Sequence, residues 1–355
     1  MSLLGLGRKK VPLLGVDMSS TSIKLIELAR KGSRYHVESY AVEPLPANAV
    51  VDRNITDVEQ VGQAIARVVK KSGTRTKFAA CAVSGSAVIT KLITVEANLS
   101  DDALEAEIRD RADQYIPYPP DQVKIDFEVK GPSAAEAGKV EVLLAASLSD
   151  VVDIRVGALE TAGLVPKVVD IEAFALENAV GLLADELQGG AEGSILAVAD
   201  VGATLTTLSV LKDRQIIYSR EQQFGGRQLT EEIQRRYGLS YEEAGLAKRQ
   251  GGLPDNYEPE VLEPFKASMA MEISRALQFF YSASQIGAID HIFVAGGCAA
   301  IAGITEAVES KTGTKTSVAN PFANMSLASR IRGEVLHNDA PAMMVACGLA
   351  LRSFD

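Results

Sequence analysis

The sequence contains no tryptophan and only three histidines and three cysteines in 355 residues. The histidines lie far apart, which argues against a metal site built from imidazole ligands. The cysteines also lack the close spacing of zinc ligands, and each has alanine, valine or glycine neighbours. We therefore expect small buried residues of a protein in a reducing compartment at Cys81, Cys298 and Cys347.

Long apolar runs and an excess of positive charge are also missing. No run approaches the ~18 apolar residues of a membrane-spanning helix, and no signal peptide is evident, so we expect a cytoplasmic protein. Lys and Arg number 36 against 46 Asp and Glu, a net charge of −10, which argues against a nucleic-acid partner. Residues 1–10 are an exception because cations follow an apolar start; this pattern fits either contact with an anionic membrane or a frayed terminus.

One short pattern occurs twice in the chain, 183 residues apart (200 − 17). Residues 13–28 and 195–211 each combine a strand-like apolar run, an aspartate, small hydroxyl or glycine residues and a second apolar run. The repetition predicts two related halves that face each other. The matched positions are Asp17 with Asp200, Thr21 with Thr204, and Leu25 with Leu208.

Apolar periodicity divides the rest of the chain into strands and helices. The first half is expected to contain three strands within 11–43, a helix at 57–71 and a buried strand at 78–85. Its remaining elements are strands at 88–95, 123–129, 140–146 and 166–171, and helices at 100–114, 150–163 and 173–187. The second half is expected to contain strands within 195–222 and at 291–295, two helices within 224–252, a helix after 297, and helices at 258–285 and 341–353.

The first turn has the chemistry of a phosphate site. Hydroxyl residues follow Asp17, and Lys24 returns seven residues later on the second strand. Backbone amides and hydroxyls can surround a phosphate while lysine supplies a point charge. A polar hairpin turn with a solvated lysine is the alternative interpretation.

Two further turns contain glycine and could also contact a nucleotide. Gly202 follows Asp200 and permits close approach to the backbone, while the carboxylate can order Mg²⁺ or a water; an ordinary turn between strands is the alternative. Gly296 and Gly297 connect a buried strand to an expected helix, where adenosine and a phosphate can approach the helix start. Each motif alone is weak, but their order within a duplicated α/β pattern is specific.

This order of two phosphate hairpins and a Gly-Gly turn resembles the actin, Hsp70 and sugar-kinase ATPase superfamily. Residues 87–164 form an expected α/β insertion in the first half, and their position in the chain resembles that of the small subdomain of FtsA. The chain as a whole resembles the PilM family of actin-like type IV pilus assembly proteins. The segments that carry this resemblance are 17–28, 114–129 with its IPYP sequence, 224–254 with its FGG sequence, and 341–352.

The resemblance implies an α/β actin-like ATPase fold with two related RNase H-like halves and an FtsA-type 1C insertion. The first half would comprise subdomain 1A, formed by 1–86, 165–190 and 335–355, and subdomain 1C, formed by 87–164. The second half would comprise subdomain 2A, formed by 191–224 and 286–334, and subdomain 2B, formed by 225–285.

The resemblance also implies an ATP and Mg²⁺ site with roles for individual residues. Asp17 and Asp200 would organise Mg²⁺, and Glu172 would be the catalytic carboxylate; a helix-start glutamate favoured by the macrodipole is the alternative for Glu172. No residue is compelled to orient an attacking water, so we expect ATP binding with weak or no hydrolysis. The remaining nucleotide contacts would come from Ser19, Ser20, Thr21, Ser22 and Lys24 at the first phosphate turn, Gly202, Ala203 and Thr204 at the second, Gly296 and Gly297 at the adenosine, and Lys266 near the base.

The implied partner is the N-terminal cytoplasmic tail of PilN, held in a groove between subdomains 1A and 1C that draws on residues 80–100 and 110–125. Tyr115, Tyr118 and Pro119 fit either that groove or packing of the insertion. The protein would lie peripherally at the bacterial inner membrane through its partners, with other pilus assembly proteins or further copies of itself as possible contacts. An FtsA-like filament-forming ATPase and a small-molecule kinase are the alternative functions.

Overall fold

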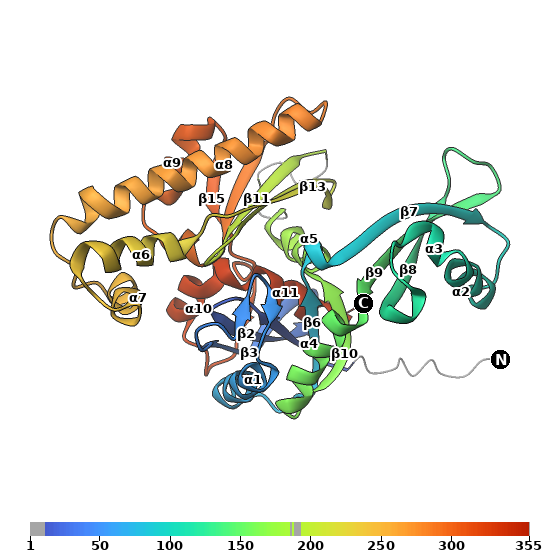
Figure 1. Ribbon diagram of the computed structural model, residues 1–355, viewed down its shortest axis with the longest axis horizontal. Coiled ribbons are helices and arrows are strands. Elements are labelled where there is room, and N and C mark those ends of the chain that lie inside the picture. The colour runs from blue at the N-terminus through green and yellow to red at the C-terminus, as the bar shows by residue number, and fades with distance from the viewer. Residues whose placement is uncertain (1–10, 185–186, 188–192, 355) are drawn as a thin grey trace.

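The computed structural model describes residues 11–184, 187 and 193–354. The expectations for residues 1–10 lie outside this range. Two main sheets form the two halves of the molecule, and an additional three-stranded sheet projects from the first half (Figure 1).

The first sheet has the strand order β10-β6-β1-β2-β3-β16. Its central hairpin is antiparallel, whereas β6 and β10 run parallel to β1. Helix α1 (Val58–Ser72) covers one face; the Asp57 side chain caps its start and a left-handed Gly73 ends it. The strands are β1 (Leu14–Met18), β2 (Ser22–Lys31), β3 (Arg34–Pro44), β6 (Phe78–Val83), β10 (Val165–Ile171) and the short β16 (Ser326–Leu327).

The second sheet repeats this arrangement, with strand order β13-β12-β11-β14-β15. Its strands are β11 (Ile195–Val201), β12 (Thr206–Lys212), β13 (Gln215–Gln222), β14 (His291–Ala295) and β15 (Thr316–Val318). The helices that accompany it are α6 (Gly226–Tyr237), α7 (Tyr241–Gln250), α8 (Glu263–Ala283), preceded by a π-helical turn at Glu258–Leu262, and α9 (Ile304–Thr312).

The two central hairpins have the same register. Leu14 faces Glu27 in the first hairpin, and Ala197 faces Val210 in the second, so both partners shift by 183 positions. Each hairpin also pairs in parallel with a later strand, β6 or β14. The predicted duplication is therefore confirmed at the level of individual strand pairs.

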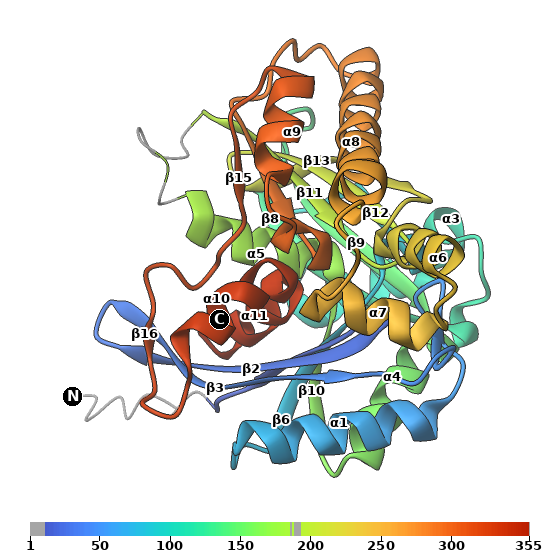
Figure 2. The same ribbon diagram turned by 90° about the vertical axis from the view of Figure 1, so that its left-hand side faces the viewer.

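Helices α5 (Glu172–Ala184) and α11 (Met344–Leu351) lie between the two sheets (Figure 2). They approach closely because Gly348 has no side chain: a Cβ there would overlap the carbonyl oxygen of Ala175. A Cβ on Gly15 would likewise overlap the carbonyl oxygen of Ala346. The apolar face of α5 packs against β11 and β14 of the second sheet, so these helices join the halves.

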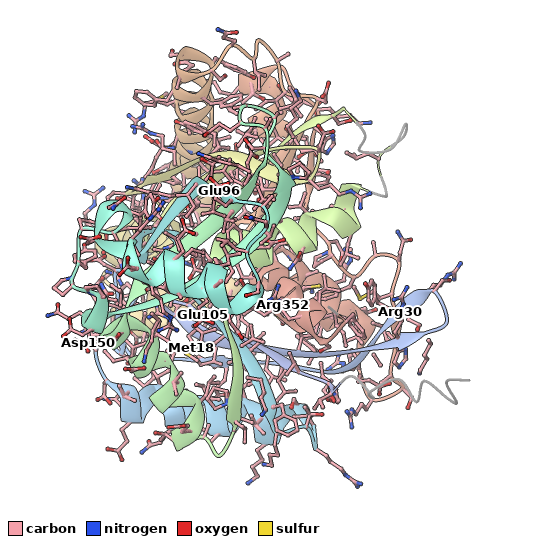
Figure 3. The ribbon with its side chains drawn as sticks, turned by 90° about the vertical axis from the view of Figure 1, so that its right-hand side faces the viewer. Met18, Arg30, Glu96, Glu105, Asp150 and Arg352 are labelled. Carbon is pink, nitrogen blue, oxygen red and sulfur yellow. The ribbon has the colours of Figure 1, made fainter. Side chains whose placement is uncertain are left out.

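The inserted sheet has its own apolar core and the order β7-β9-β8. Its elements are β7 (Val88–Glu96), α2 (Asp101–Asp110), α3 (Ala112–Tyr115), β8 (Val123–Pro132) and β9 (Lys139–Leu148). Figure 3 views it from its outer side, with Glu96 at the end of β7 and Glu105 on α2. The single helix expected at 100–114 is wrong, because the helix is interrupted at Arg111.

Helix α4 (Ser149–Thr161) packs with the first sheet although the expected insertion, 87–164, included it. Ala158 and Leu159 are buried with α1 and β6 in one apolar cluster. A Cβ on Gly62 of α1 would lie 2.5 Å from the Thr161 Cβ, so these helices pack closely. We therefore propose that the insertion ends at Leu148.

Two expectations near the C-terminus also need correction. Gly296 and Gly297 do not open an α-helix: a 3₁₀ turn at Gly297–Ala300 follows, and α9 begins at Ile304. The helix expected at 341–353 consists of α11 between two 3₁₀ turns, Ala340–Met343 and Arg352–Phe354. A separate helix, α10 (Gly333–Asp339), precedes it. In the described part of the chain, no helix has the length and apolar character needed to cross a bilayer.

Candidate functional site

The first hairpin holds a buried ion pair at its tip. Asp17 and Lys24 are direct partners across β1 and β2, and Lys24 Nζ lies 2.7 Å from Asp17 Oδ2. The same ammonium donates to Ser19 Oγ at 2.8 Å, and each side chain of the pair is only 11% exposed. The alternative of a solvated lysine is therefore wrong. Lys24 is a fixed positive charge at the base of the turn.

The turn above this pair is closed by Ser19, whose backbone N–H and hydroxyl both donate to the carbonyl of Ser22, at 3.1 and 2.9 Å. Thr21 at the tip is exposed, and its carbonyl accepts from Leu45 N–H. Ser20 and Ser22 are partly exposed. Ser19 thus contacts Lys24 directly, whereas the other predicted hydroxyl residues lie exposed or partly exposed on the same polar turn.

The second hairpin carries Asp200 at the position equivalent to Asp17. Its turn is fixed against the start of α6, because Gly226 N–H donates to the Gly202 carbonyl at 3.0 Å and Arg227 N–H to the Ala203 carbonyl at 2.7 Å. A Cβ on Gly225 would lie 2.6 Å from the Ala203 oxygen. Gly202, Ala203 and Thr204 therefore form a turn with a fixed backbone and partly exposed surface.

Gly296 brings the third motif against the second. Its φ is +83°, and a Cβ there would lie 2.5 Å from Asp200 Oδ1, so only glycine fits this contact. A Cβ on Gly297 would meet open space. The Gly-Gly turn therefore lies directly against the Asp200 carboxylate.

Three carboxylates influence one another at this site. Burial raises the pKa of Asp200, with Asp17 adding to the shift and Lys24 and Arg53 opposing it. Burial also raises the pKa of Glu172 to about 7; the charges of Asp17 and Asp200 push in the same direction, while Arg53 opposes them. The structure thus brings Glu172 into the electrostatic field of both hairpins.

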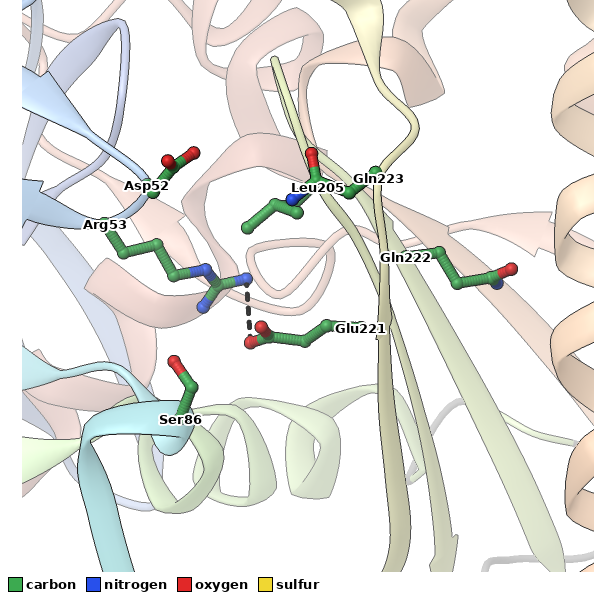
Figure 4. Close-up of a pocket in the computed structure, with 7 residues that line it drawn as sticks. All are labelled: Asp52, Arg53, Ser86, Leu205, Glu221, Gln222 and Gln223. Atoms are coloured by element: carbon green, nitrogen blue, oxygen red, sulfur yellow. Dashed lines mark ion pairs between the residues drawn. The ribbon is translucent and has the colours of Figure 1, made fainter.

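Arg53 is a site residue that the sequence analysis missed. It occupies a turn between the short strands β4 (Val50–Val51) and β5 (Asn54–Ile55), where Asp52 and Arg53 both have left-handed backbones, with φ of +47° and +64°. Its guanidinium pairs with Glu172. It also reaches the second half, donating to Thr207 Oγ1 at 2.8 Å and lying 3.6 Å from Glu221 Oε1 (Figure 4).

A cavity of about 260 Å³ lies beside this guanidinium, lined by residues of both halves. Arg53 and Ser86 contribute from the first half, and Leu205 and Glu221 from the second. The residues that line it are Asp52, Arg53, Ser86, Leu205, Glu221, Gln222 and Gln223 (Figure 4).

Two lysines of the second half, Lys248 and Lys266, contact the start of α6 and the turn before α9. Lys248, which the sequence analysis did not select, donates to the Gly226 carbonyl at 3.0 Å and to Thr230 Oγ1 at 2.7 Å, and burial lowers its pKa. The Cys298 thiol lies near it. Lys266 pairs with Glu263 and donates to the Ala302 carbonyl at 3.3 Å, which places it beside the turn that leads into α9.

The donor set fits a magnesium–nucleotide complex. Among the described residues, no group of three or more acidic, histidine or cysteine side chains is arranged to hold a metal alone. Mg²⁺ usually keeps several waters and takes one or two carboxylates together with substrate phosphates. Asp17 is already bonded to Lys24, whereas Asp200 forms no side-chain hydrogen bond within the described residues. Asp200 is therefore better placed than Asp17 to act as the carboxylate ligand of Mg²⁺.

Two related sheets with matching hairpin registers, joined by paired helices, define an actin-like α/β fold. Residues 15–354 match the family model described as type IV pilus assembly protein PilM. The chain belongs to the PilM family of type IV pilus assembly proteins.

One solved structure agrees with this assignment, and two more distant ones agree with the fold. The chain is similar to a chain of a PilM-PilN type IV pilus biogenesis complex, with 26% identity, a TM-score of 0.79, and coverage of 98% of this chain and 99% of that chain. EutJ, an ethanolamine utilization protein from Carboxydothermus hydrogenoformans, has 16% identity, a TM-score of 0.54 and coverage of 96% and 89%. MreB 5 of Spiroplasma citri, solved bound to AMPPNP, has 12% identity, a TM-score of 0.50 and coverage of 96% and 95%.

Proposed function

We propose that this pilus assembly protein is an adaptor that binds Mg-ATP in the cleft between its two halves. The observation that carries the proposal is the matched placement of Asp17 and Asp200 in two hairpins of identical register. Lys24 supplies a buried positive charge beside the first turn, and Gly296 leaves room against Asp200. Binding to turns on both halves favours their closure.

Each site residue has a specific part in this binding. Lys24 and the amides of Ser20 and Thr21 would hold phosphate oxygens, and Asp200 would hold Mg²⁺ directly or through water, with Asp17 behind Lys24. The metal neutralises phosphate charge when bound. Glu172 must leave its ion pair with Arg53 before it can orient a water, so we propose that hydrolysis is slow.

Calorimetric titration of the full chain with ATP, with and without Mg²⁺, tests this site. Saturable binding that strengthens with Mg²⁺ is expected. If the chain binds ATP neither with nor without Mg²⁺, the proposed nucleotide site is wrong. Ultracentrifugation over a range of protein concentrations with Mg-ATP addresses the alternative function: an adaptor remains in the supernatant, whereas pelleting that depends on nucleotide would favour the FtsA-like filament.

The partner that we propose is the N-terminal tail of a PilN-type membrane protein. The likeness to a chain of a PilM-PilN type IV pilus biogenesis complex supports it. The expected groove between the first half and the insertion would use residues 80–100 and 110–125. Tyr118 is 43% exposed and Leu92 is 59% exposed, so both can contact a peptide. Tyr115, in contrast, packs against the core of the insertion.

A fluorescent peptide with the sequence of that tail tests the partner directly. We expect saturable binding that Tyr118→Ala weakens several-fold, with Tyr241→Ala as a control because Tyr241 is equally exposed, at 42%, but belongs to α7. Comparing titrations with and without Mg-ATP measures the coupling between nucleotide and peptide. Absence of peptide binding in both conditions would contradict the adaptor function.

A further inference from the structure

The second hairpin lacks a cation of its own at the position where the first hairpin has Lys24. Lys24 faces Asp17 across the first hairpin, and Thr207 faces Asp200 across the second. Arg53 fills this gap from the other half of the molecule, because its guanidinium donates to Thr207 Oγ1 at 2.8 Å. Each acidic hairpin thus has a cation beside it, one from its own strand and one from across the cleft.

Both the backbone and the side chain of Arg53 are held in place by neighbouring residues. Its left-handed turn is fixed by Arg155, which is buried and donates from Nη2 to the Arg53 carbonyl at 2.8 Å and from Nε to the Ala82 carbonyl at 2.9 Å. The Arg53 side chain then reaches two acids: Glu172 at the start of α5 and Glu221 on β13. Glu172 belongs to the first half and Glu221 to the second, so this one side chain connects the halves.

The pair with Glu221 is the weaker of the two contacts. Its atoms are 3.6 Å apart, and the Glu221 side chain is 32% exposed. The cavity of about 260 Å³ opens directly beside it. This volume is below the ~300 Å³ at which small-molecule pockets usually begin, so it suits a phosphoryl group and its waters better than a whole nucleotide.

We propose that Arg53 detects the terminal phosphate of the bound nucleotide and thereby determines the preference for a triphosphate over a diphosphate. This inference depends on the nucleotide site proposed above. A terminal phosphate accepts two parallel hydrogen bonds from a guanidinium, a stronger arrangement than the distant pair with Glu221. Arg53 exchanges Glu221 for the phosphate when ATP binds and keeps Glu221 when ADP binds. The contact of Glu221 on β13 with Arg53 of the first half therefore depends on the number of phosphates.

Calorimetry of the full chain with Mg-ATP and Mg-ADP tests this assignment. For Arg53→Ala we expect the Kd for ATP to rise about tenfold or more and the Kd for ADP to change less than about threefold. Arg53→Lys should recover only part of the preference, since an ammonium cannot form the bidentate contact. Glu221→Gln should tighten ATP binding, because it removes the competitor. Arg67→Ala is the matched control, since Arg67 pairs with Glu43 within the first half.

Hydrogen exchange of the nucleotide-free chain provides a second measurement. Arg53→Ala should speed amide exchange in β12 and β13, because Thr207 and Glu221 lose their contacts with the Arg53 guanidinium. Equal losses of ATP and ADP affinity, or an unchanged ratio, would overturn the sensing role while leaving the nucleotide site intact. A wild-type chain that binds no nucleotide would overturn both proposals, and the circular dichroism spectrum and Tm of each variant identify any loss of folding.

Discussion

Lys24 lies directly opposite Asp17 in the first hairpin, with its ammonium 2.7 Å from the carboxylate and both side chains largely buried. Removing one partner leaves an uncompensated buried charge, which typically costs about 3–5 kcal/mol. Lys24→Ala should therefore lower the free energy of unfolding by about 3–5 kcal/mol and weaken Mg-ATP binding at least tenfold. Urea denaturation and calorimetry measure the two effects.

A double variant separates these two effects. In Asp17→Asn with Lys24→Met, both charges are gone, so we expect much of the lost stability to return while ATP affinity stays low. Wild-type ATP affinity in the double variant would show that Lys24 does not contact phosphate. Stability that remains as low as in Lys24→Ala would show that the pair is not an isolated electrostatic unit.

The contact between α11 and α5 predicts a severe effect of one methyl group. In Gly348→Ala the new Cβ would overlap the Ala175 carbonyl oxygen, and both partners are helix backbone that cannot move separately. We expect a loss of about 3 kcal/mol or more, or failure to fold. Gly181→Ala is the matched control, because a Cβ there has no neighbour within 4 Å, and alanine should stabilise α5 by up to about 1 kcal/mol. Similar Tm changes in both variants would contradict the close packing.

Glu172 predicts a pH dependence of stability. Its pKa is about 7 in the folded chain against an ordinary value of 4.5, so the folded chain keeps a proton that the unfolded chain has released between these values. This contribution is fully present below pH 4.5 and is lost as the pH rises through about 7. Between pH 5 and pH 8 the wild type should lose about 1–3 kcal/mol more than Glu172→Gln. Parallel stability curves for the two proteins would refute the raised pKa.

The duplicated hairpins were predictable because their signal is local. An aspartate at the end of an apolar run and a return strand seven residues later appear in the sequence itself, and the structure places them in identical registers. Most element limits were predicted within a few residues for the same reason. The prediction that Gly296 and Gly297 lead directly into an α-helix was wrong, because glycines before a helix do not reveal whether a 3₁₀ turn intervenes.

Contacts between distant segments were not predictable. Arg53 lies in a short polar turn with no periodic signal, and its partner Thr207 is 154 residues away. The only local indication is that Asp52 and Arg53 form a tight turn between two very short strands. Similarly, the spacing of apolar residues predicts that α4 is a helix, but only its packing beside α1 assigns it to the first half.

Gly296 predicts a defect in metal-dependent binding. In Gly296→Ala the Cβ would overlap the Val201 carbonyl oxygen and lie 2.5 Å from Asp200 Oδ1, and alanine is strained at a φ of +83°. We expect the end of β11 and its Asp200 carboxylate to be displaced, so that the strengthening of ATP binding by Mg²⁺ falls at least tenfold, with a stability loss of about 2–5 kcal/mol. Gly287→Ala is the matched control and should behave as wild type, since a Cβ there has no neighbour within 4 Å and Gly287 lies outside the proposed site. Titrations with Mg²⁺ and with EDTA measure this dependence. If Gly296→Ala retains the full Mg²⁺ effect, Asp200 does not hold the metal, and Asp17 becomes the remaining carboxylate ligand at the two hairpins.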